Sequence, residues 1–88
     1  MSNQPKIEIY TKMYCGYCFR AKRLLDTKGV EYTEYDITLG GPKRAEMLER
    51  QPPATTVPQV FIDGRAIGGS DDLARLDSEG KLDSLLGL

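Results

Sequence analysis

The sequence predicts an α/β fold built on a four-stranded mixed sheet. Stretches with strand and helix patterns alternate along the chain, and a helical crossover between the first two strands makes those strands parallel. Asp63-Gly64 supplies a tight hairpin turn between the last two strands, because both residues tolerate a positive φ. The expected order is strand, helix, strand, helix, strand, strand, helix and a short terminal helix.

In the first half of the chain, the spacing of apolar residues predicts the secondary-structure elements. Residues 7–11 alternate apolar and polar side chains, which predicts a strand with one face toward a core. Apolar side chains from Tyr17 to Leu25 recur at helical spacing, and Gly29 is placed to end that helix. A second strand is predicted over residues 30–37.

In the second half of the chain, residues that favour the start or the end of a helix help to predict the elements. Pro42 suits the first position of a helix that ends before a pair of prolines. Residues 57–62 are rich in β-branched and aromatic side chains, which predicts the third strand, and residues 65–67 return as the fourth. Ser70 is expected to cap the next helix, and the leucines of residues 82–86 form a short amphipathic segment.

The composition is that of one small globular domain, which we expect to span residues 1–88. Hydrophobic residues make up 40% and charged residues 28% of the chain, which argues against a disordered tail, a coiled coil or a collagen-like repeat. A formal net charge of -1 gives no overall electrostatic footprint for nucleic acid or an anionic membrane, so neither is an expected partner.

The amino-terminal stretch predicts the compartment. It has no apolar signal core, and no apolar run approaches the roughly 20 residues of a membrane span. We therefore expect a cytoplasmic protein. Cytosolic reductants keep thiols reduced, so the two cysteines are expected to act as reactive thiols and not as a permanent structural disulfide.

Cys15-Gly16-Tyr17-Cys18 is the strongest chemical signal, because this pair of thiols lies where a strand meets a helix. Free N–H groups and the helix dipole at a helix N-terminus stabilise a thiolate, which is the nucleophile of thiol–disulfide exchange. Cys18 lies one turn further on the same side, from which it can attack a mixed disulfide on Cys15. We expect Cys15 to be exposed and reactive, and Cys18 to be more buried.

Other uses of the cysteine pair are weaker but stay open. Two Cys and no His cannot supply the usual four zinc ligands within one chain, so no resident metal is expected. A metal or cluster shared between chains remains an alternative. A structural disulfide is a further one, disfavoured by the reducing compartment.

Three motifs lie around the cysteine pair in a fixed order. Tyr10-Thr11-Lys12 precedes it, residues 56–62 read Thr-Val-Pro-Gln-Val-Phe-Ile, and residues 68–73 read Gly-Gly-Ser-Asp-Asp-Leu. With these motifs the chain resembles the glutaredoxins, in their small bacterial dithiol branch, over residues 6–86. The resemblance implies a thioredoxin-like fold with helices on both faces of the sheet. Thioredoxin itself matches less well, because Tyr14 stands where it usually carries a Trp.

The resemblance also implies a glutathione site formed by Lys12, Tyr17, Thr56, Val57, Pro58, Gly69, Ser70 and Asp71. Pro58 would be cis and face Cys15, which leaves the backbone of Val57 free to pair with the cysteinyl backbone of glutathione. Backbone N–H groups at Ser70 and Asp71 would take the γ-glutamyl carboxylate. The Asp71 side chain would lie near the ammonium group of glutathione.

Several of these residues have a simpler alternative. Lys12 would favour the thiolate and meet the glycyl carboxylate of glutathione, but a lone loop lysine is most often solvated. Tyr17 would wall the glutathione groove, although it could equally pack within its helix. For Ser70 and Asp71 the simpler alternative is ordinary helix capping, which is compatible with the glutathione contact. For Asp72 capping alone is expected.

The implied activity is reduction of glutathione mixed disulfides and protein disulfides, with Cys15 as nucleophile, Cys18 as resolving thiol and glutathione as co-substrate. Expected partners are glutathionylated or disulfide-containing proteins and, indirectly, glutathione reductase with NADPH. The apo protein is expected to be a monomer without a tightly bound cofactor. The alternative is a [2Fe-2S] cluster held by a dimer, in which each chain gives Cys15 and two glutathiones complete the ligands.

The chain departs from the glutaredoxin pattern at three places. Gly16 replaces the proline most common between the cysteines, and glutaredoxins without that proline are more often associated with clusters. Residues 52–55 lack the Arg or Gln that helps many relatives bind the glycyl carboxylate, so this contact is expected from Lys12 or Gln51. Ser70 stands where some relatives carry an extra Cys, which leaves no third thiol for regulation.

Overall fold

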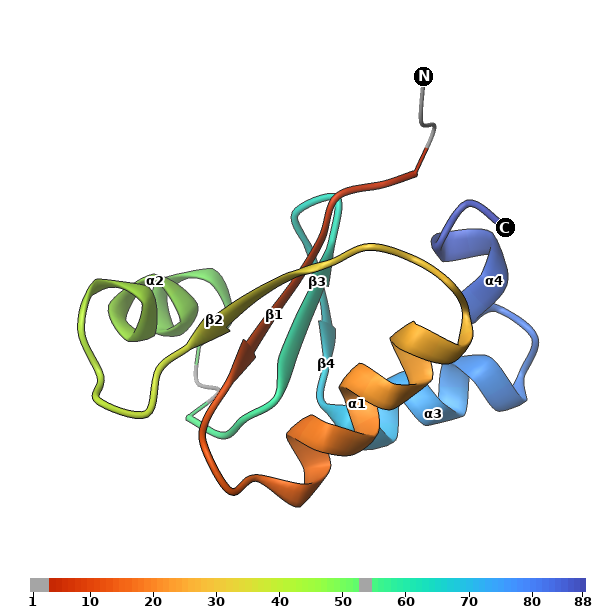
Figure 1. The fold of residues 1–88 in the computed structure, drawn as a ribbon. Helices are drawn as coiled ribbons and strands as arrows, with labels where there is room; N and C mark the ends of the chain where they lie inside the picture. The colour runs from red at the N-terminus through yellow and green to blue at the C-terminus, as the bar shows by residue number, and fades with distance from the viewer. Residues whose placement is uncertain (1–3, 53–54) are drawn as a thin grey trace.

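The computed structural model describes residues 4–52 and 55–88, and its elements follow the expected order (Figure 1). The strands form one sheet in the order β2-β1-β3-β4, with β1 parallel to β2 and the other neighbours antiparallel. The predicted mixed sheet is therefore confirmed. The elements are β1 (Ile7–Thr11), α1 (Gly16–Thr27), β2 (Thr33–Asp36), α2 (Pro42–Arg50), β3 (Gln59–Ile62), β4 (Arg65–Gly68), α3 (Ser70–Ser78) and α4 (Leu82–Leu85).

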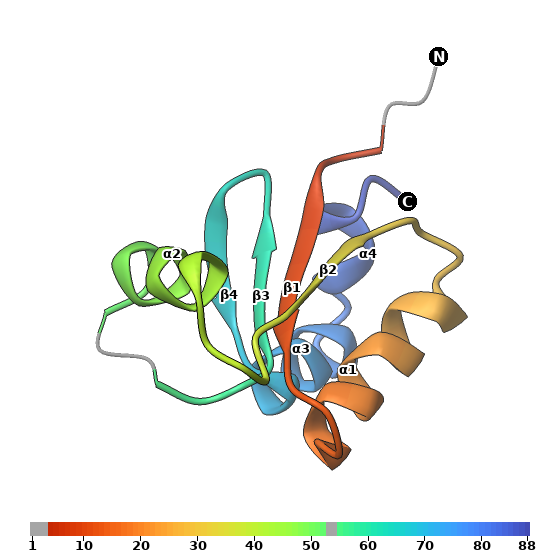
Figure 2. The same cartoon turned by 60° about the vertical axis from the view of Figure 1, so that its left-hand side comes forward.

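Helices cover both faces of the sheet, with α2 on one side and α1, α3 and α4 on the other (Figures 1 and 2). Ile9 packs with Leu25 of α1 and Leu73 of α3 in the larger apolar cluster. Tyr10 packs with Met47 of α2 in the smaller one. Within the described residues, no helix is long and apolar enough to cross a membrane.

The expectation that β1 turns only one face to a core is wrong. All five residues of β1 are buried, including Glu8 and Tyr10. The strand is central in the sheet and has a helical layer on each side, so both sets of alternating side chains are covered. Alternation in the sequence therefore marks two different cores here.

Some element boundaries also differ from the prediction. β2 covers only Thr33–Asp36, and β3 begins at Gln59, after the Val57–Pro58 bond, which is cis as the resemblance implies. Gly69, not Ser70, is the N-cap of α3. Asp72 accepts a hydrogen bond from the Gly69 N–H at 3.0 Å, which confirms its expected capping role.

Turn residues behave as their chemistry predicts. Asp63 and Gly64 both have positive φ, 51° and 79°, at the hairpin between β3 and β4. Gly29 has a φ of 73° just beyond the end of α1, which confirms it as the residue that ends this helix. α2 ends at Arg50, ahead of the proline pair. Pro53 and Ala54, in the segment predicted to lack a glutathione contact, lie outside the described residues.

A buried polar network ties the end of α2 to β1. Arg50 donates to both carboxylate oxygens of Glu8, at 2.9 and 3.1 Å, and to the hydroxyl of Tyr10 at 2.9 Å. The Tyr35 hydroxyl also donates to Glu8, at 2.9 Å. The Arg50 guanidinium lies 4.0 Å from the ring centre of Phe61, an additional cation–π contact. This network fixes the helix end from which Gln51 continues into the site described next.

Candidate active site

Cys15 occupies the junction between β1 and α1, and its sulfur is the N-cap of the helix. The Cys18 N–H donates to Cys15 Sγ at 3.1 Å, so a free helix N–H group points at the sulfur. The backbone of Cys15 is extended, with φ -102° and ψ 107°. A thiolate on Cys15 is thereby placed where the helix dipole favours negative charge.

The two thiols differ in burial as expected, although Cys15 is half-buried and not fully exposed. Cys18 is only 1% exposed. Burial, and after it the hydrogen bond with Cys15, raises the pKa of the Cys18 thiol to about 12. Both cysteines are free thiols in this structure. Cys15 is therefore the accessible thiol, and Cys18 keeps its proton at neutral pH.

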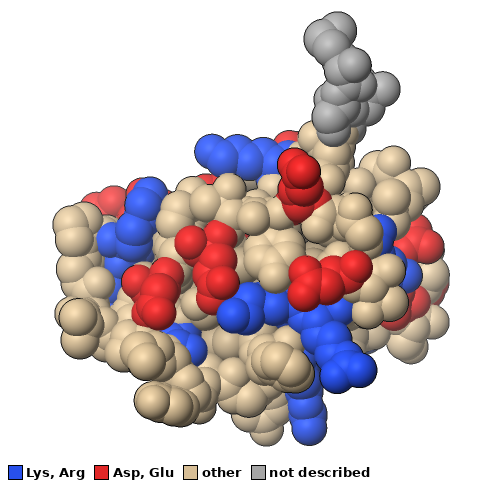
Figure 3. All heavy atoms as spheres, in the orientation of Figure 1, with Lys and Arg blue, Asp and Glu red and all other residues tan. Residues whose placement is uncertain are grey.

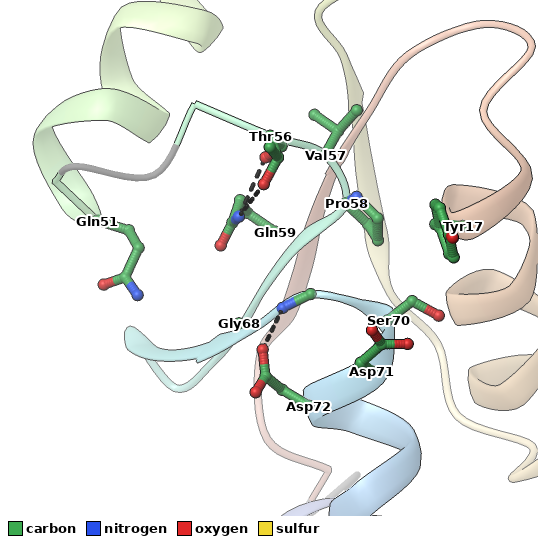
Figure 4. A pocket seen from close by; sticks show the side chains of 11 residues that line it. Tyr17, Gln51, Thr56, Val57, Pro58, Gln59, Gly68, Ser70, Asp71 and Asp72 are labelled. Carbon is green, nitrogen blue, oxygen red and sulfur yellow. Dashed lines mark hydrogen bonds between the residues drawn. The ribbon is translucent and has the colours of Figure 1, made fainter.

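A pocket lies beside Cys15, bounded by Tyr17 of α1, the segment before β3 and the start of α3 (Figure 4). Cys15 approaches its edge, because its thiol donates to the carbonyl oxygen of Val57 at 3.9 Å. In Figure 4, Tyr17 lies across the pocket from Pro58 and Ser70. The lining residues are Tyr17, Gln51, Thr56, Val57, Pro58, Gln59, Gly68, Gly69, Ser70, Asp71 and Asp72.

The structure brings together the predicted glutathione residues with one exception. Tyr17 and Gln51 both line the pocket together with residues 56–58 and 69–71. Lys12 instead lines an adjacent hollow that also contains Cys15 and Cys18. Cys15 thus lines this hollow together with Lys12 and reaches the first pocket through its contact with the Val57 carbonyl.

Three pocket residues were not among the predicted ones: Gln59, Gly68 and Asp72. Gln59 is buried and its side chain donates to the Thr56 carbonyl at 3.0 Å, which holds the segment before Pro58. A polar residue at the start of an otherwise apolar strand was the available signal. The sequence predicts only a capping role for Asp72, and Asp72 performs that role from the wall of the pocket.

The paired glycines let two walls of the pocket come close together. Gly68 has a φ of 115°, which side chains rarely adopt, and a Cβ there would lie 2.8 Å from Cγ of Asp72. At Gly69 a Cβ would lie 3.4 Å from the carbonyl oxygen of Pro58. The start of α3 therefore approaches Pro58 closely because the two preceding residues have no side chains.

We expect Gly68→Ala to lower the free energy of unfolding by about 2 kcal/mol and to raise the KM for a substrate bound in this pocket. The new methyl group adds backbone strain and displaces the Asp72 carboxylate that caps α3. Urea unfolding and steady-state kinetics measure both effects. Gly64→Ala is the matched control, because it also places Ala at positive φ but meets no atom within 4 Å. Equal losses for the two variants would contradict this account of Gly68.

Comparison with known proteins decides the family. The family model described as Glutaredoxin matches residues 7–67. The chain belongs to the glutaredoxin family. It is 55% identical over 80 residues to glutaredoxin 3 of Escherichia coli (strain K12), a match that covers 91% of this chain and 95% of that protein.

Solved glutaredoxin structures superpose closely on the chain. The buckwheat glutaredoxin–glutathione complex has a TM-score of 0.83 and 34% identity, covering 94% of this chain and 77% of that one. The holo form of glutaredoxin C1 from Populus tremula x tremuloides has a TM-score of 0.82 and 32% identity, covering 92% and 82%. These matches confirm the thioredoxin-like fold that the resemblance implied. The chain is a dithiol glutaredoxin, a glutathione-dependent thiol–disulfide oxidoreductase.

Proposed function

We propose that this glutaredoxin reduces glutathione mixed disulfides and protein disulfides with Cys15 as nucleophile and Cys18 as resolving thiol. The observation that carries the assignment is the position of the Cys15 sulfur. It accepts the Cys18 N–H at the start of α1 and borders the pocket through the Val57 carbonyl. Cys18 is one turn deeper and 1% exposed, which suits a thiol that reacts only within the molecule.

Glutathione binds in this proposal along the pocket that ends at Cys15. The backbone of Val57 pairs with the cysteinyl residue of the tripeptide, in the manner of an added strand. The first N–H groups of α3, at Ser70 and Asp71, take the γ-glutamyl carboxylate, because they have no partners within the helix. Gln51 is on the α2 side of the same pocket and is favoured over Lys12 for the glycyl carboxylate.

The monothiol reaction uses Cys15 alone. The Cys15 thiolate attacks the glutathione sulfur of a glutathionylated substrate, which forms a Cys15–glutathione disulfide and releases the substrate thiolate, which takes up a proton. A second glutathione thiolate then attacks that disulfide and regenerates Cys15, with oxidised glutathione as product. Glutathione reductase and NADPH would return the oxidised glutathione, and we propose that the cycle runs in the cytoplasm on a monomeric protein.

The test is glutathione-dependent reduction of a mixed disulfide between glutathione and a small thiol, coupled through glutathione reductase to NADPH consumption. The proposal requires fast turnover by the wild-type protein that saturates with glutathione mixed disulfide. Negligible turnover by a folded protein would reject it and favour the second candidate.

The second candidate is an iron–sulfur cluster shared by two chains. Two observations favour it: Gly16 stands in place of the usual proline, and the holo form of a related glutaredoxin is among the similar structures. Within residues 4–52 and 55–88 there is no group of three or more His, Cys, Asp or Glu residues that could hold a metal. Each chain would therefore give Cys15, and two glutathione thiolates would complete the ligands.

We expect Gly16→Pro to fold, to gain about 0.4–1 kcal/mol in unfolding free energy and to weaken any cluster binding. Gly16 is the first residue of α1, a Cβ on it meets no atom within 4 Å, and the extended backbone of Cys15 suits a following proline. Thermal unfolding measures the first effect. Visible absorption after anaerobic reconstitution with iron, sulfide and glutathione measures the second. Colourless wild-type protein would exclude the cluster function.

A further inference from the structure

Lys22 and Glu34 form a charged pair in the hollow that both cysteines line, which is distinct from the proposed glutathione pocket. The hollow is lined by both cysteines together with Lys22, Glu34 and Asp36. Lys22 Nζ lies 3.0 Å from Glu34 Oε2, and the same oxygen accepts a hydrogen bond from Thr11 at 2.7 Å. In Figure 3, acidic and basic side chains are interspersed over the visible face of the molecule, with no large patch of one sign.

The position of Lys22 relative to Cys18 is fixed by the helix. Residues four apart share one face of an α-helix, so Lys22 follows Cys18 along the same side of α1. The Lys22 side chain is 30% exposed and that of Glu34 is 37% exposed. The pair is thus partly shielded from solvent, and the charge of the ammonium group is screened less than on an open surface.

The monothiol reaction proposed above assigns no role to the Lys22–Glu34 pair, whereas the dithiol reaction requires a thiolate on Cys18. A buried thiol must lose its proton before it can attack, and burial opposes the thiolate of Cys18. Two groups act against this rise in the pKa of Cys18: a hydrogen bond with the Lys12 backbone and, after it, the positive charge of Lys22, which lines the same hollow one helical turn further on. Asp36, the other carboxylate of the hollow, accepts hydrogen bonds from the N–H and hydroxyl of Thr38 at 2.8 and 2.5 Å.

We infer that Lys22 accelerates the resolving step by stabilising the Cys18 thiolate, and that Glu34 moderates this effect by pairing with the Lys22 ammonium. This inference rests on the proposed function, in which Cys18 resolves the mixed disulfide. Lys22 and Glu34 are positioning residues in this scheme, because neither touches the substrate. Through the rate of the resolving step, they set the share of mixed disulfide that reacts by the dithiol route and not by the monothiol route.

The step itself balances as an internal disulfide exchange. Cys18 gives its proton to solvent, and the Cys18 thiolate attacks Cys15 Sγ within the mixed disulfide. The Cys15–Cys18 bond forms, the bond from Cys15 to the substrate sulfur breaks, and the substrate leaves as a thiolate that takes up a proton. The two cysteines are oxidised by two electrons and the substrate disulfide is reduced by two.

The inference predicts opposite effects for the two partners of one ion pair. Lys22→Met removes the positive charge and should slow the resolving step about threefold, whereas Glu34→Gln should speed it about twofold. The amide introduced by Glu34→Gln would keep a carbonyl oxygen for Lys22 and Thr11 but would carry no negative charge. A purely structural role would make both variants worse, because each one breaks the same ion pair.

The experiment mixes reduced protein with an aromatic disulfide that releases a coloured thiolate. Attack by Cys15 releases the first equivalent in a bimolecular phase, and attack by Cys18 releases the second in a phase independent of reagent concentration. The second phase is the readout for Lys22→Met, Lys22→Arg and Glu34→Gln. Cys18→Ser should abolish that phase, and Lys22→Arg, which keeps the charge, should restore most of the rate lost in Lys22→Met.

A series of measurements at increasing ionic strength completes the test. Raising the ionic strength should reduce the differences between the variants, because the pair is partly exposed. An unchanged second phase in Lys22→Met, or slowing by Glu34→Gln, would overturn the inference. Absence of the first phase, together with absence of glutathione-dependent turnover in the wild type, would instead reject the proposed function on which the inference rests.

Discussion

Cys15→Ser should lower glutathione-dependent turnover by at least about a thousandfold while the protein remains folded. A serine hydroxyl is a far weaker nucleophile at neutral pH than a cysteine thiolate and cannot form the mixed disulfide. Serine is also a favoured N-cap residue, so its oxygen can accept the Cys18 N–H that now points at the sulfur. The NADPH-coupled assay measures the loss, and circular dichroism verifies the fold.

Cys18→Ser is the matched control for this loss. It replaces the other cysteine with the same residue but leaves the accessible thiol in place. We expect it to retain the monothiol reaction with glutathione mixed disulfides and to lose reduction of protein disulfides by the dithiol route. Full activity in Cys15→Ser, or a greater loss in Cys18→Ser on glutathione mixed disulfides, would reverse the assigned roles.

Arg50→Met should lower the free energy of unfolding by about 3 kcal/mol, because it removes the cation that hydrogen-bonds the buried Glu8 carboxylate and leaves it, among the described residues, only the exposed Lys6 ammonium, 3.9 Å away. The Glu8 side chain is only 6% exposed, and that of Arg50 is 23% exposed. Arg50 supplies two of the hydrogen bonds to that carboxylate. Urea unfolding at neutral pH measures the change. A loss below about 1 kcal/mol, the size expected for a surface ion pair, would show that the pair is weakly coupled to the fold.

The pH dependence of this loss has a defined sign. The hydrogen bond from Arg50 holds the pKa of Glu8 below its ordinary value of 4.5. A group with a lowered pKa in the folded state stabilises the protein above its unfolded pKa, and this contribution disappears as the pH falls through the folded pKa. The stability difference between wild type and Arg50→Met should therefore be largest near neutral pH and shrink below about pH 4.5.

Replacing both partners separates the buried charge from the packing. Glu8→Gln combined with Arg50→Met removes the charge that Arg50→Met alone would strand, so the double variant should be more stable than the single one. If the double variant is no more stable than Arg50→Met, the stranded charge is not the main cost, and the loss in Arg50→Met comes from the lost contacts of Arg50 with Phe61 and Tyr10.

Local patterns predicted the elements well where one residue type has one conformational use. Asp63 and Gly64 predict a turn because both tolerate a positive φ, and Gly29 predicts a helix end for the same reason; all three have positive φ in the structure. The switch from strand to helix spacing predicts a helix start at the cysteine pair, and α1 begins at Gly16.

What local patterns missed depends on contacts between distant segments. The alternation of β1 does not reveal that α2 packs on the polar side, where Arg50 neutralises Glu8 from 42 positions away. Lys12 is three residues from Cys15, but it lines the hollow that contains both cysteines and not the pocket lined by Tyr17 and Pro58. Gln59 belongs to the site because its side chain donates a hydrogen bond to the Thr56 carbonyl, and residue spacing does not predict this contact.

The most direct test of the central claim is to locate glutathione on the protein itself. Cys18→Ser protein is incubated with oxidised glutathione, digested without reductant and mapped by mass spectrometry. Our account predicts one glutathione per chain, attached to Cys15, and released by added glutathione. A protein that remains unmodified at Cys15 under these conditions would contradict the assignment of Cys15 as the nucleophile.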